Sequence, residues 1–206
     1  MAKLCFKYAA MNSGKTIDLL RTAHNYEENG YKVLVMKPIV DTKGGDNIVT
    51  RIGLQRKVDY LISSADSIIK MLKGKLSDVS AIFIDEAQFL KRNQIDELFK
   101  IAHLCDIAVI CYGLRSDFQT NAFEGSSRLL ELAEDMQELK TMCHCGKTAR
   151  FNARKVNGVF ASIGESIVID GTINTEYVPL CGDCYLKEVI GLDLEEEKIK
   201  IKTRKE

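Results

Sequence analysis

The stretch YAAMNSGKT at residues 8–16 decides the fold of this chain. The segment before it, residues 3–8, alternates polar and apolar residues as a β-strand does, and the segment at about 15–28 has the apolar spacing of a helix. A loop of the pattern G-x-x-x-x-G-K-[ST] between a strand and a helix is typical of proteins that bind nucleoside triphosphates. Ala9 takes the place of the first glycine, and the rest of the pattern is kept. This placement predicts a phosphate-binding loop.

Such a loop works through backbone N–H groups that surround the phosphates, backed by the N-terminus of the helix. Lys15 is expected to neutralise the β- and γ-phosphates, and the Thr16 hydroxyl is expected to bind Mg²⁺. The residues expected around the phosphates of ATP are Ala9, Ala10, Met11, Asn12, Ser13, Gly14, Lys15 and Thr16. The alternative is that SGKT stands at a helix start by chance, with Ser13 as a simple N-cap.

An acidic pair follows a strongly apolar segment in AIFIDEAQF, residues 81–89. Asp85 stands where a buried strand is expected to end, as does the aspartate that holds Mg²⁺ in nucleotide-hydrolysing proteins. Glu86 follows directly, and a carboxylate there can take a proton from an attacking water or hydroxyl group. The pair could instead cap the next helix, but its combination with the phosphate loop favours catalysis. Taken alone, the pair fits an ATPase and a kinase equally well.

Strand-like and helix-like segments alternate from residue 3 to about 140. Further strands are expected at 31–38, 81–85, 106–113 and 137–142, and further helices at 64–73, 91–104 and 126–135. Short buried strands that alternate with helices are typical of a parallel sheet with helices on both faces. Residues 1–140 are therefore predicted to form an α/β domain with the P-loop NTPase (RecA-like) fold, a parallel sheet flanked by helices.

Two close cysteine pairs mark a second region: Cys143 with Cys145, and Cys181 with Cys184. Four thiolates can hold Zn²⁺ in a tetrahedral structural site that leaves no open position for water. The first pair has the tighter C-x-C spacing, so His144 is an alternative ligand. Four reduced cysteines in a small core are the remaining alternative.

The segment between the cysteine pairs reads as a β-hairpin with Asn157-Gly158 at its turn. Residues 141–191 are therefore predicted to form a small β-rich domain that is stabilised by zinc. Residues 192–206 are a charged tail, rich in Glu and Lys, that is expected to be a frayed helix or disordered.

Composition narrows the class of protein. The 206 residues include 29 Lys and Arg and 29 Asp and Glu, without the basic excess that phosphate contacts usually require of a nucleic-acid binder. The apolar runs are too short to span a bilayer. No secretion signal is apparent, and seven cysteines is an odd number, so disulfides are not expected. We therefore expect a cytoplasmic protein without a nucleic-acid or membrane partner.

The chain resembles one family along most of its length, the type II thymidine kinases in their bacterial form. The stretches that carry the resemblance are YAAMNSGKT (8–16), VTRIGL (49–54), IDEAQFL (84–90), CYGLRSDF (111–118), LKTMCHCGKTA (139–149), GESIVIDGT (164–172) and EYVPLCGDCY (176–185). They follow the family's order and spacing. The resemblance implies a homotetrameric enzyme of pyrimidine salvage that transfers the γ-phosphate of ATP to the 5′-hydroxyl of thymidine, and to that of deoxyuridine.

The resemblance also implies roles for single residues. Glu86 matches the general base that deprotonates the 5′-hydroxyl, and Asp85 joins Thr16 at Mg²⁺. The further nucleotide-binding residues that it implies are Asp41, Arg51, Asp85 and Gln88. The four cysteines match the family's zinc ligands.

Other matching residues concern the nucleoside. Those that match the lining of the base pocket are Met11, Phe89, Leu114, Phe118 and Phe123. Those that match the lasso, a loop that closes over the nucleoside, are Val168, Ile169, Asp170, Gly171, Thr172 and Tyr177. Each phenylalanine could equally be ordinary core packing, and Asp170-Gly171-Thr172-Ile173 departs from the glycine pair that is usual in the lasso.

Two other classes of protein are alternatives to a kinase. A P-loop ATPase that remodels nucleic acid would hydrolyse ATP faster when DNA or RNA is added. A nucleotide-binding regulator with a zinc module would bind ATP without forming a phosphorylated product.

Overall fold

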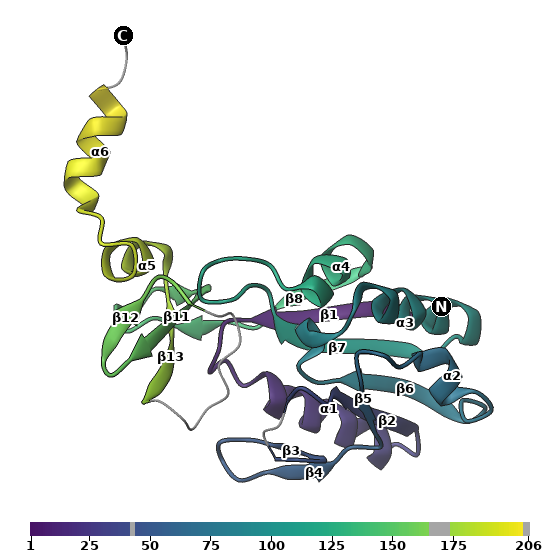
Figure 1. Ribbon diagram of the computed structural model, residues 1–206. Helices are drawn as coiled ribbons and strands as arrows, with labels where there is room; N and C mark the ends of the chain where they lie inside the picture. Colours follow the sequence, from purple (N-terminus) through teal and green to yellow (C-terminus); the bar gives the residue numbers. More distant parts are fainter. Residues whose placement is uncertain (42–43, 165–173, 204–206) are drawn as a thin grey trace. The chain divides into compact units, whose positions relative to one another are not determined.

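The computed structural model describes residues 1–41, 44–164 and 174–203 (Figure 1). The chain divides into two compact units. Unit 1 comprises Met1–Ala9, Gly14–Arg115 and Ala122–Leu139, and unit 2 comprises Ala10–Ser13, Ser116–Asn121 and Lys140–Glu206. The chain therefore enters unit 2 twice before residue 140, once within the expected phosphate loop and once within the stretch CYGLRSDF and the residues after it.

Unit 1 is an α/β unit built on one parallel sheet. Its elements are β1 (Leu4–Ala9), α1 (Lys15–Glu28), β2 (Lys32–Pro38), β3 (Asn47–Val49), β4 (Gln55–Lys57), β5 (Tyr60–Ile62), α2 (Ile68–Leu72), β6 (Val79–Ile84), the 3₁₀ helix η1 (Ala87–Phe89), α3 (Arg92–Cys105), β7 (Ala108–Leu114), α4 (Glu124–Leu132) and β8 (Asp135–Glu138). Six strands form the sheet in the order β5-β2-β6-β7-β1-β8, and each pairing is parallel. The predicted α/β class with a parallel sheet is thus confirmed.

The strand order places the predicted chemistry at one edge of the sheet. The carboxyl ends of parallel strands lie at the same edge, which is where α/β proteins bind their ligands. The loop that carries Lys15 follows β1, and the Asp85–Glu86 pair follows β6. Only β7 separates these two strands.

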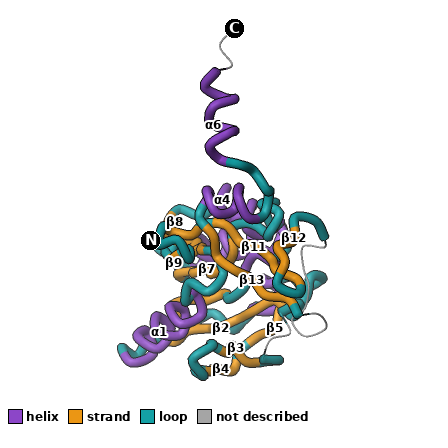
Figure 2. The backbone as a smooth tube through the Cα atoms, turned by 90° about the vertical axis from the view of Figure 1, so that its left-hand side faces the viewer, coloured by secondary structure: helices purple, strands orange, loops and turns teal. Residues whose placement is uncertain are grey.

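Both faces of the sheet are apolar. Successive side chains of a strand point to opposite faces, and the central strands carry apolar residues at both sets of positions. Ile84 of β6 packs in one buried cluster with Leu98 of α3, together with residues of α2 and α4. Its neighbour Phe83 packs in a second cluster with Leu19 of α1 and with the β3–β4 hairpin. Helix α1 therefore covers one face, and helices α2, α3 and α4 cover the other (Figures 1 and 2).

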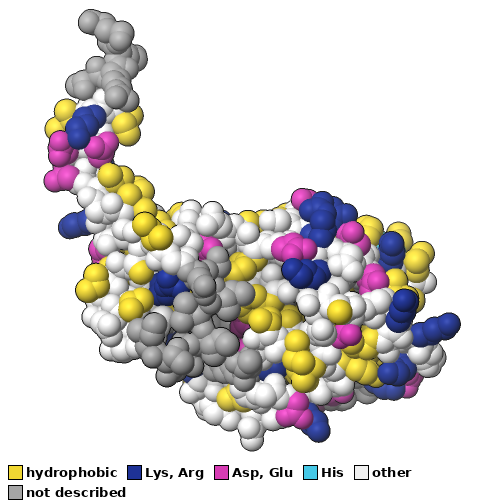
Figure 3. Space-filling view, viewed as in Figure 1, with side chains coloured by type: hydrophobic (Ala, Val, Ile, Leu, Met, Phe, Trp, Pro, Cys, Tyr) yellow, Lys and Arg dark blue, Asp and Glu magenta, His cyan; other side chains and the backbone are white. Residues whose placement is uncertain are grey.

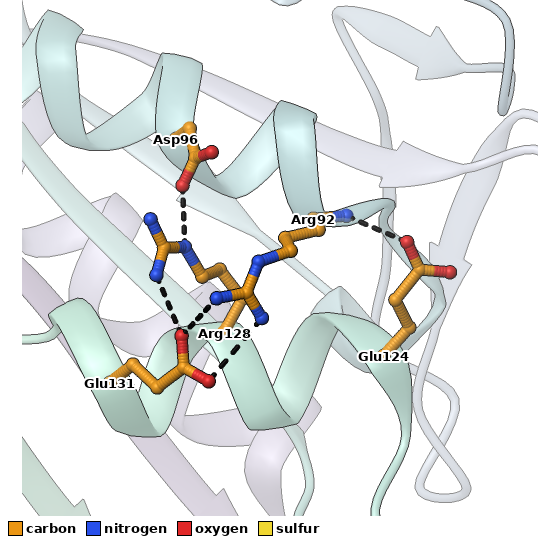
Figure 4. Close-up of polar contacts among 5 residues, drawn as sticks. All are labelled: Arg92, Asp96, Glu124, Arg128 and Glu131. Atoms are coloured by element: carbon orange, nitrogen blue, oxygen red, sulfur yellow. Dashed lines mark hydrogen bonds and ion pairs between the residues drawn. The ribbon is translucent and has the colours of Figure 1, made fainter.

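Charged side chains connect α3 with α4 on the surface of unit 1 (Figure 4). Arg128 of α4 donates hydrogen bonds to Asp96 of α3 and to Glu131, and Arg92 of α3 also donates to Glu131 at 2.6 Å. Glu124 accepts the backbone N–H of Arg92 at 3.0 Å, so it satisfies a free N–H at the start of α3. Exposed pairs of this kind add little stability individually. Together they hold α4 against α3.

Unit 2 is rich in β-structure. Its elements are β9 (Thr141–Met142), β10 (Thr148–Ala149), β11 (Phe151–Val156), β12 (Val159–Ala161), β13 (Thr175–Leu180), α5 (Gly182–Glu188) and α6 (Leu194–Thr203). Strands β9 and β10 form one antiparallel ribbon, and β12, β11 and β13 form an antiparallel sheet. Asn157 has φ 51° and Gly158 has φ 81°. Positive φ at both central residues is the requirement of a two-residue hairpin turn, so the predicted turn is confirmed.

Strands β3, β4 and β5 have no counterpart in the sequence prediction, and several other elements differ from it in their bounds. Helix α2 begins only at Ile68, because the Ser67 hydroxyl accepts the N–H of Lys70 and caps the helix there. Helix α4 ends at Leu132, and the chain then forms β8, which pairs in parallel with β1. The predicted strand at 137–142 is consequently two strands, β8 in unit 1 and β9 in unit 2.

The surface carries both signs of charge. On the face drawn in Figure 3, basic and acidic side chains are interspersed, in keeping with the 29 basic and 29 acidic residues of the sequence. Within the described ranges, each helix is too short or too polar to cross a membrane.

Candidate nucleotide-binding site and cysteine cluster

The phosphate loop starts from an ordinary strand end. Ala9 is the last residue of β1 and is not among the residues with positive φ, so this position does not need a glycine. Gly14 does, because it precedes α1 with φ 79°. Among the described residues no side chain caps the first turn of α1, and the Ser13 hydroxyl has no hydrogen-bond partner. The interpretation of Ser13 as a simple N-cap is therefore wrong, and no side chain of the described residues takes the place at this turn where phosphate oxygens are expected to bind.

Lys15 is buried at the start of α1, with 7% of its surface exposed. Burial lowers the pKa of its ammonium group, while the carboxylates of Glu86 and Asp85 raise that pKa and Arg51 lowers it. The start of α1 and the residues after β6 thus bring Lys15 and two carboxylates within electrostatic reach of one another. This is the combination that the sequence predicted for handling the phosphates of ATP.

Asp85 is also buried, and its surroundings favour a bound cation. Burial, together with the carboxylates of Glu86 and Asp41, raises the pKa of this carboxyl to about 7 against the opposing effects of Lys15 and of the hydrogen bond from the Glu86 N–H. Carboxylates that are buried close together become ionised together only when a positive charge compensates them. Mg²⁺ prefers such oxygen ligands, and the half-buried Thr16 hydroxyl offers a further one. The donor set therefore fits Mg²⁺.

A buried lysine holds Asp41, and the sequence did not reveal it. Lys37 is fully buried at the end of β2. Its Nζ donates to Asp41 Oδ2 at 3.0 Å and to the Asn47 carbonyl at 3.1 Å. A lysine near the end of a strand usually reaches solvent, so no sequence signal separates this one from a surface residue.

The pair of aromatic residues expected at the base pocket is in contact. The rings of Phe89 and Phe123 meet edge to face, with centroids 5.7 Å apart and an interplanar angle of 80°. Leu114 ends β7, and its N–H donates to the Gln88 side chain at 3.1 Å. The Gln88 amide also donates to the Glu86 carboxylate. Contacts within unit 1 therefore connect the expected general base to Gln88 and Leu114, and connect Phe89 to Phe123.

Unit 2 carries the middle of the phosphate loop. The N–H of Met11 donates to Asn152 Oδ1 at 2.8 Å, and the Asn12 amide donates to the Tyr177 carbonyl at 3.3 Å. Asn152 is buried in β11 and also donates to the Ser116 carbonyl at 2.8 Å. Asn152 thus ties two short segments of unit 2 to its sheet. The sequence gives no sign of this role, because an isolated asparagine in a strand carries no motif.

Phe118 is fully buried in unit 2. The guanidinium carbon of Arg154 lies 3.8 Å from the centre of its ring, and the Tyr185 hydroxyl donates to its carbonyl at 2.6 Å. These contacts give Phe118 a packing role within unit 2. The other expected nucleoside residues of this unit are Met11 and Tyr177, which are described, and Val168, Ile169, Asp170, Gly171 and Thr172, which lie outside the described residues.

The four cysteines of the two pairs form one cluster, in which all sulfurs lie within 4.8 Å of one another. Burial acts to raise the pKa of the Cys143 thiol, but hydrogen bonds from the backbone N–H groups of Cys145 and Cys181 bring it down to about 6. Burial and the neighbouring sulfurs raise the pKa of Cys184. Four thiolates at these distances repel one another unless a cation is shared. The cluster therefore fits a structural Zn²⁺ ion.

His144 lies beside this cluster rather than completing it. Its Nε2 is 2.8 Å from Glu188 Oε1, and His144, Cys184 and Glu188 form an overlapping group of possible ligands. Because the four sulfurs already make a complete set of four ligands, the structure favours the cysteines as the zinc ligands.

The chain is similar to known proteins along most of its length. The family model described as "Thymidine kinase" matches residues 2–185. The thymidine kinase of Enterobacteria phage T4 is 43% identical over 185 residues, which cover 88% of this chain and 94% of that enzyme. The thymidine kinase of Streptococcus gordonii is 41% identical over 193 residues, 93% of this chain and 100% of that enzyme. The thymidine kinase of Francisella tularensis subsp. holarctica is 40% identical over 188 residues, 88% of this chain and 95% of that enzyme.

Proposed function

The chain belongs to the thymidine kinase family and phosphorylates thymidine, and we propose that it does so by moving the γ-phosphate of ATP to the nucleoside 5′-hydroxyl with Glu86 as the general base. The observation that carries the mechanism is the grouping of Lys15, Asp85 and Glu86 at the carboxyl edge of the sheet. A kinase needs a cation on the transferred phosphate, a metal ligand and a base, and these three side chains supply them.

The proposed transfer forms one bond to the γ-phosphorus and breaks another. Glu86 accepts the proton of the 5′-hydroxyl as that oxygen bonds to the γ-phosphorus, and the bond from the γ-phosphorus to the oxygen bridging it to the β-phosphate breaks to release ADP. Lys15 and the N–H groups of the loop stabilise the charge on the phosphates. Thr16 and Asp85 would hold Mg²⁺, which neutralises phosphate charge when it is bound. We place Asp41 and Arg51 near the phosphates for the same reason.

The nucleoside contacts are part of the proposal. Phe89, Leu114 and Phe123 of unit 1 would bind the base, and Met11, Phe118 and Tyr177 of unit 2 would contact the nucleoside. The lasso residues 168–172 would read the edge of the pyrimidine through backbone groups, and deoxyuridine would be accepted as well as thymidine. Zn²⁺ on the four cysteines would stabilise unit 2. We further propose a cytoplasmic homotetramer that binds neither nucleic acid nor membranes.

The decisive test is phosphoryl transfer from ATP, with Mg²⁺, to thymidine, deoxyuridine, deoxycytidine and purine nucleosides. We expect the monophosphates of thymidine and deoxyuridine, and ATP turnover that DNA and RNA do not stimulate. ATP hydrolysis that depends on added nucleic acid would support a remodelling ATPase instead. Tight nucleotide binding without any product would indicate a regulator.

Removing one ring of the aromatic pair should weaken nucleoside binding. We expect Phe123→Ala to raise the KM for thymidine by about 5- to 150-fold, the range for loss of base stacking on an aromatic ring, with the KM for ATP unchanged. Phe99→Ala is the matched control, because Phe99 packs against the core of the same unit and contacts the ring of His103 instead. Steady-state kinetics with each substrate varied in turn would measure both. Equal effects of the two variants on thymidine would assign Phe123 to packing alone.

A further inference from the structure

We propose that Gln88 is a positioning residue for phosphoryl transfer: its side-chain amide holds the Glu86 carboxylate in place against the end of β7. It acts through Glu86 rather than through contact with the nucleotide. This inference rests on the proposed role of Glu86 as general base. The sequence resemblance placed Gln88 among the nucleotide-binding residues, and the geometry favours a different task.

The orientation of the Gln88 amide follows from its partners. Gln88 is buried, with 1% of its surface exposed. Its Oε1 accepts the backbone N–H of Leu114 at 3.1 Å, and a backbone N–H can only donate. The Nε2 end of the amide must therefore face Glu86, whose carboxylate accepts its hydrogen bond. Both ends of the amide are thus engaged with protein groups.

The backbone of Glu86 is held in an unusual conformation. Glu86 has φ 48° and ψ 39°, in the left-handed region that non-glycine residues rarely adopt. Its N–H donates to Asp85 Oδ1 at 3.1 Å. The residue is therefore fixed at its backbone by Asp85 and at its carboxylate by Gln88. Strain of this kind persists where the surroundings over-determine a conformation, as they do at functional sites.

Two glycines allow β7 and α4 to pack closely against the turn that carries Gln88. A Cβ on Gly113 of β7 would lie 2.7 Å from Gln88 Oε1 and 3.2 Å from the Gln88 nitrogen. A Cβ on Gly125 of α4 would lie 2.5 Å from the Ala87 carbonyl oxygen and 2.8 Å from that of Leu90. The turn that carries Gln88 is thus packed closely between β7 and α4.

The anchor of the amide is itself fixed. Leu114 accepts a hydrogen bond at its carbonyl from the buried Ser126 hydroxyl, while its N–H is bound by Gln88. Side chains from η1 and α4 therefore hold both polar groups of this one peptide residue. Through Gln88, the position of the Glu86 carboxylate depends on the rigid end of β7.

Gln88→Leu tests the proposal, and the chain offers a close control in Gln94. Gln94 is equally buried at 1% exposure, accepts the N–H of Lys91 at 3.0 Å and donates to the carbonyls of Ser63 and Asp66. A misplaced catalytic group costs up to about 100-fold in rate, so we expect Gln88→Leu to lower kcat by about 10- to 100-fold. The KM values for ATP and thymidine should stay near those of the wild type. Gln94→Leu should lower the unfolding temperature without this loss of kcat.

Gly113→Ala provides a second, independent variant. The added methyl group would lie 2.7 Å from Gln88 Oε1, so the amide must shift, which disturbs its hydrogen bonds with the Leu114 N–H and the Glu86 carboxylate. We expect a fall in kcat in the same direction as for Gln88→Leu. This variant carries the test if Gln88→Leu does not fold.

A double-mutant cycle with Glu86→Gln separates the two proposals. If Gln88 acts through Glu86, Gln88→Leu adds no further loss of kcat in the Glu86→Gln background. A full additional loss there, a rise mainly in the KM for ATP, or an equal kcat loss in Gln94→Leu would overturn the positioning role. A Glu86→Gln enzyme with nearly wild-type turnover would instead overturn the general-base role. If Glu86→Gln lost its turnover while Gln88→Leu kept the kcat of the wild type, the positioning role alone would be overturned.

Discussion

Replacing Glu86 by glutamine is expected to reduce kcat for thymidine by about 10²- to 10⁴-fold, the contribution of a positioned general base. Glutamine has nearly the shape of glutamate and can still accept the hydrogen bond from Gln88, but it cannot take up the proton of the 5′-hydroxyl. Lys15 and Asp85 are unchanged in this variant, so the KM for ATP should change little. Steady-state kinetics and a direct measurement of ATP binding would give both quantities.

Glu97→Gln is the matched control for that variant. Glu97 is a carboxylate of unit 1 that accepts hydrogen bonds from the Ser67 hydroxyl and from the N–H of Ile69 at the start of α2. Its loss should affect the stability of α2 and leave kcat unchanged. If Glu86→Gln kept most of its turnover, another group would have to accept the proton, and the assignment of the base would fail.

The parts of the site that the sequence predicted are contiguous motifs. Lys15 and Thr16 follow a strand and open a helix, and Asp85 and Glu86 end another apolar strand. Strand and helix periodicity are local properties, and a parallel sheet then brings the ends of such strands to one edge. The fold class and the general location of the site could therefore be inferred without coordinates.

The parts that the sequence did not reveal are contacts over long distances along the chain. Asn152 binds the N–H of Met11 across 141 positions, and Gln88 binds the N–H of Leu114 across 26. Neither contact has a local signature, because a lone amide in a strand or turn looks the same whether it faces solvent or a buried N–H. The start of α2 at Ser67 could not be predicted for a different reason. Several polar residues nearby have the side chain of a helix N-cap, so the local signal was present but ambiguous.

The division of the phosphate loop between two units also depends on such contacts. Ala10–Ser13 belong to unit 2, although they connect β1 and α1 of unit 1 along the chain. Within unit 2 they are held by Asn152 and by the Tyr177 carbonyl. Both of these partners lie on the sheet that the cysteine cluster adjoins, since Cys143 and Cys181 pack in one buried cluster with residues of β11 and β13. Order in the loop therefore depends on order in unit 2.

Removal of the metal, or Cys181→Ser, is accordingly expected to unfold unit 2 and to abolish kinase activity. Structural zinc sites contribute about 10–16 kcal/mol of binding free energy to folding, far more than a small β-rich core supplies. The binding of ATP should be lost as well as that of thymidine, because Met11 and Asn12 lose the partners that hold their segment of the loop. Hydrogen exchange should accelerate across residues 140–164 and 174–190, while the parallel sheet of unit 1 stays protected. Elemental analysis should give one zinc per chain in the active protein.

Cys105→Ser is the control for this experiment, because Cys105 is an exposed cysteine at the end of α3 in unit 1 and lies outside the cluster. It should retain zinc, exchange protection and activity. A metal-free or Cys181→Ser protein that kept both its exchange protection in unit 2 and its turnover would show that the four cysteines are only part of a small core. Loss of thymidine turnover with intact ATP binding would show instead that the loop segment Ala10–Ser13 keeps its conformation without the rest of unit 2, and that zinc serves the nucleoside alone.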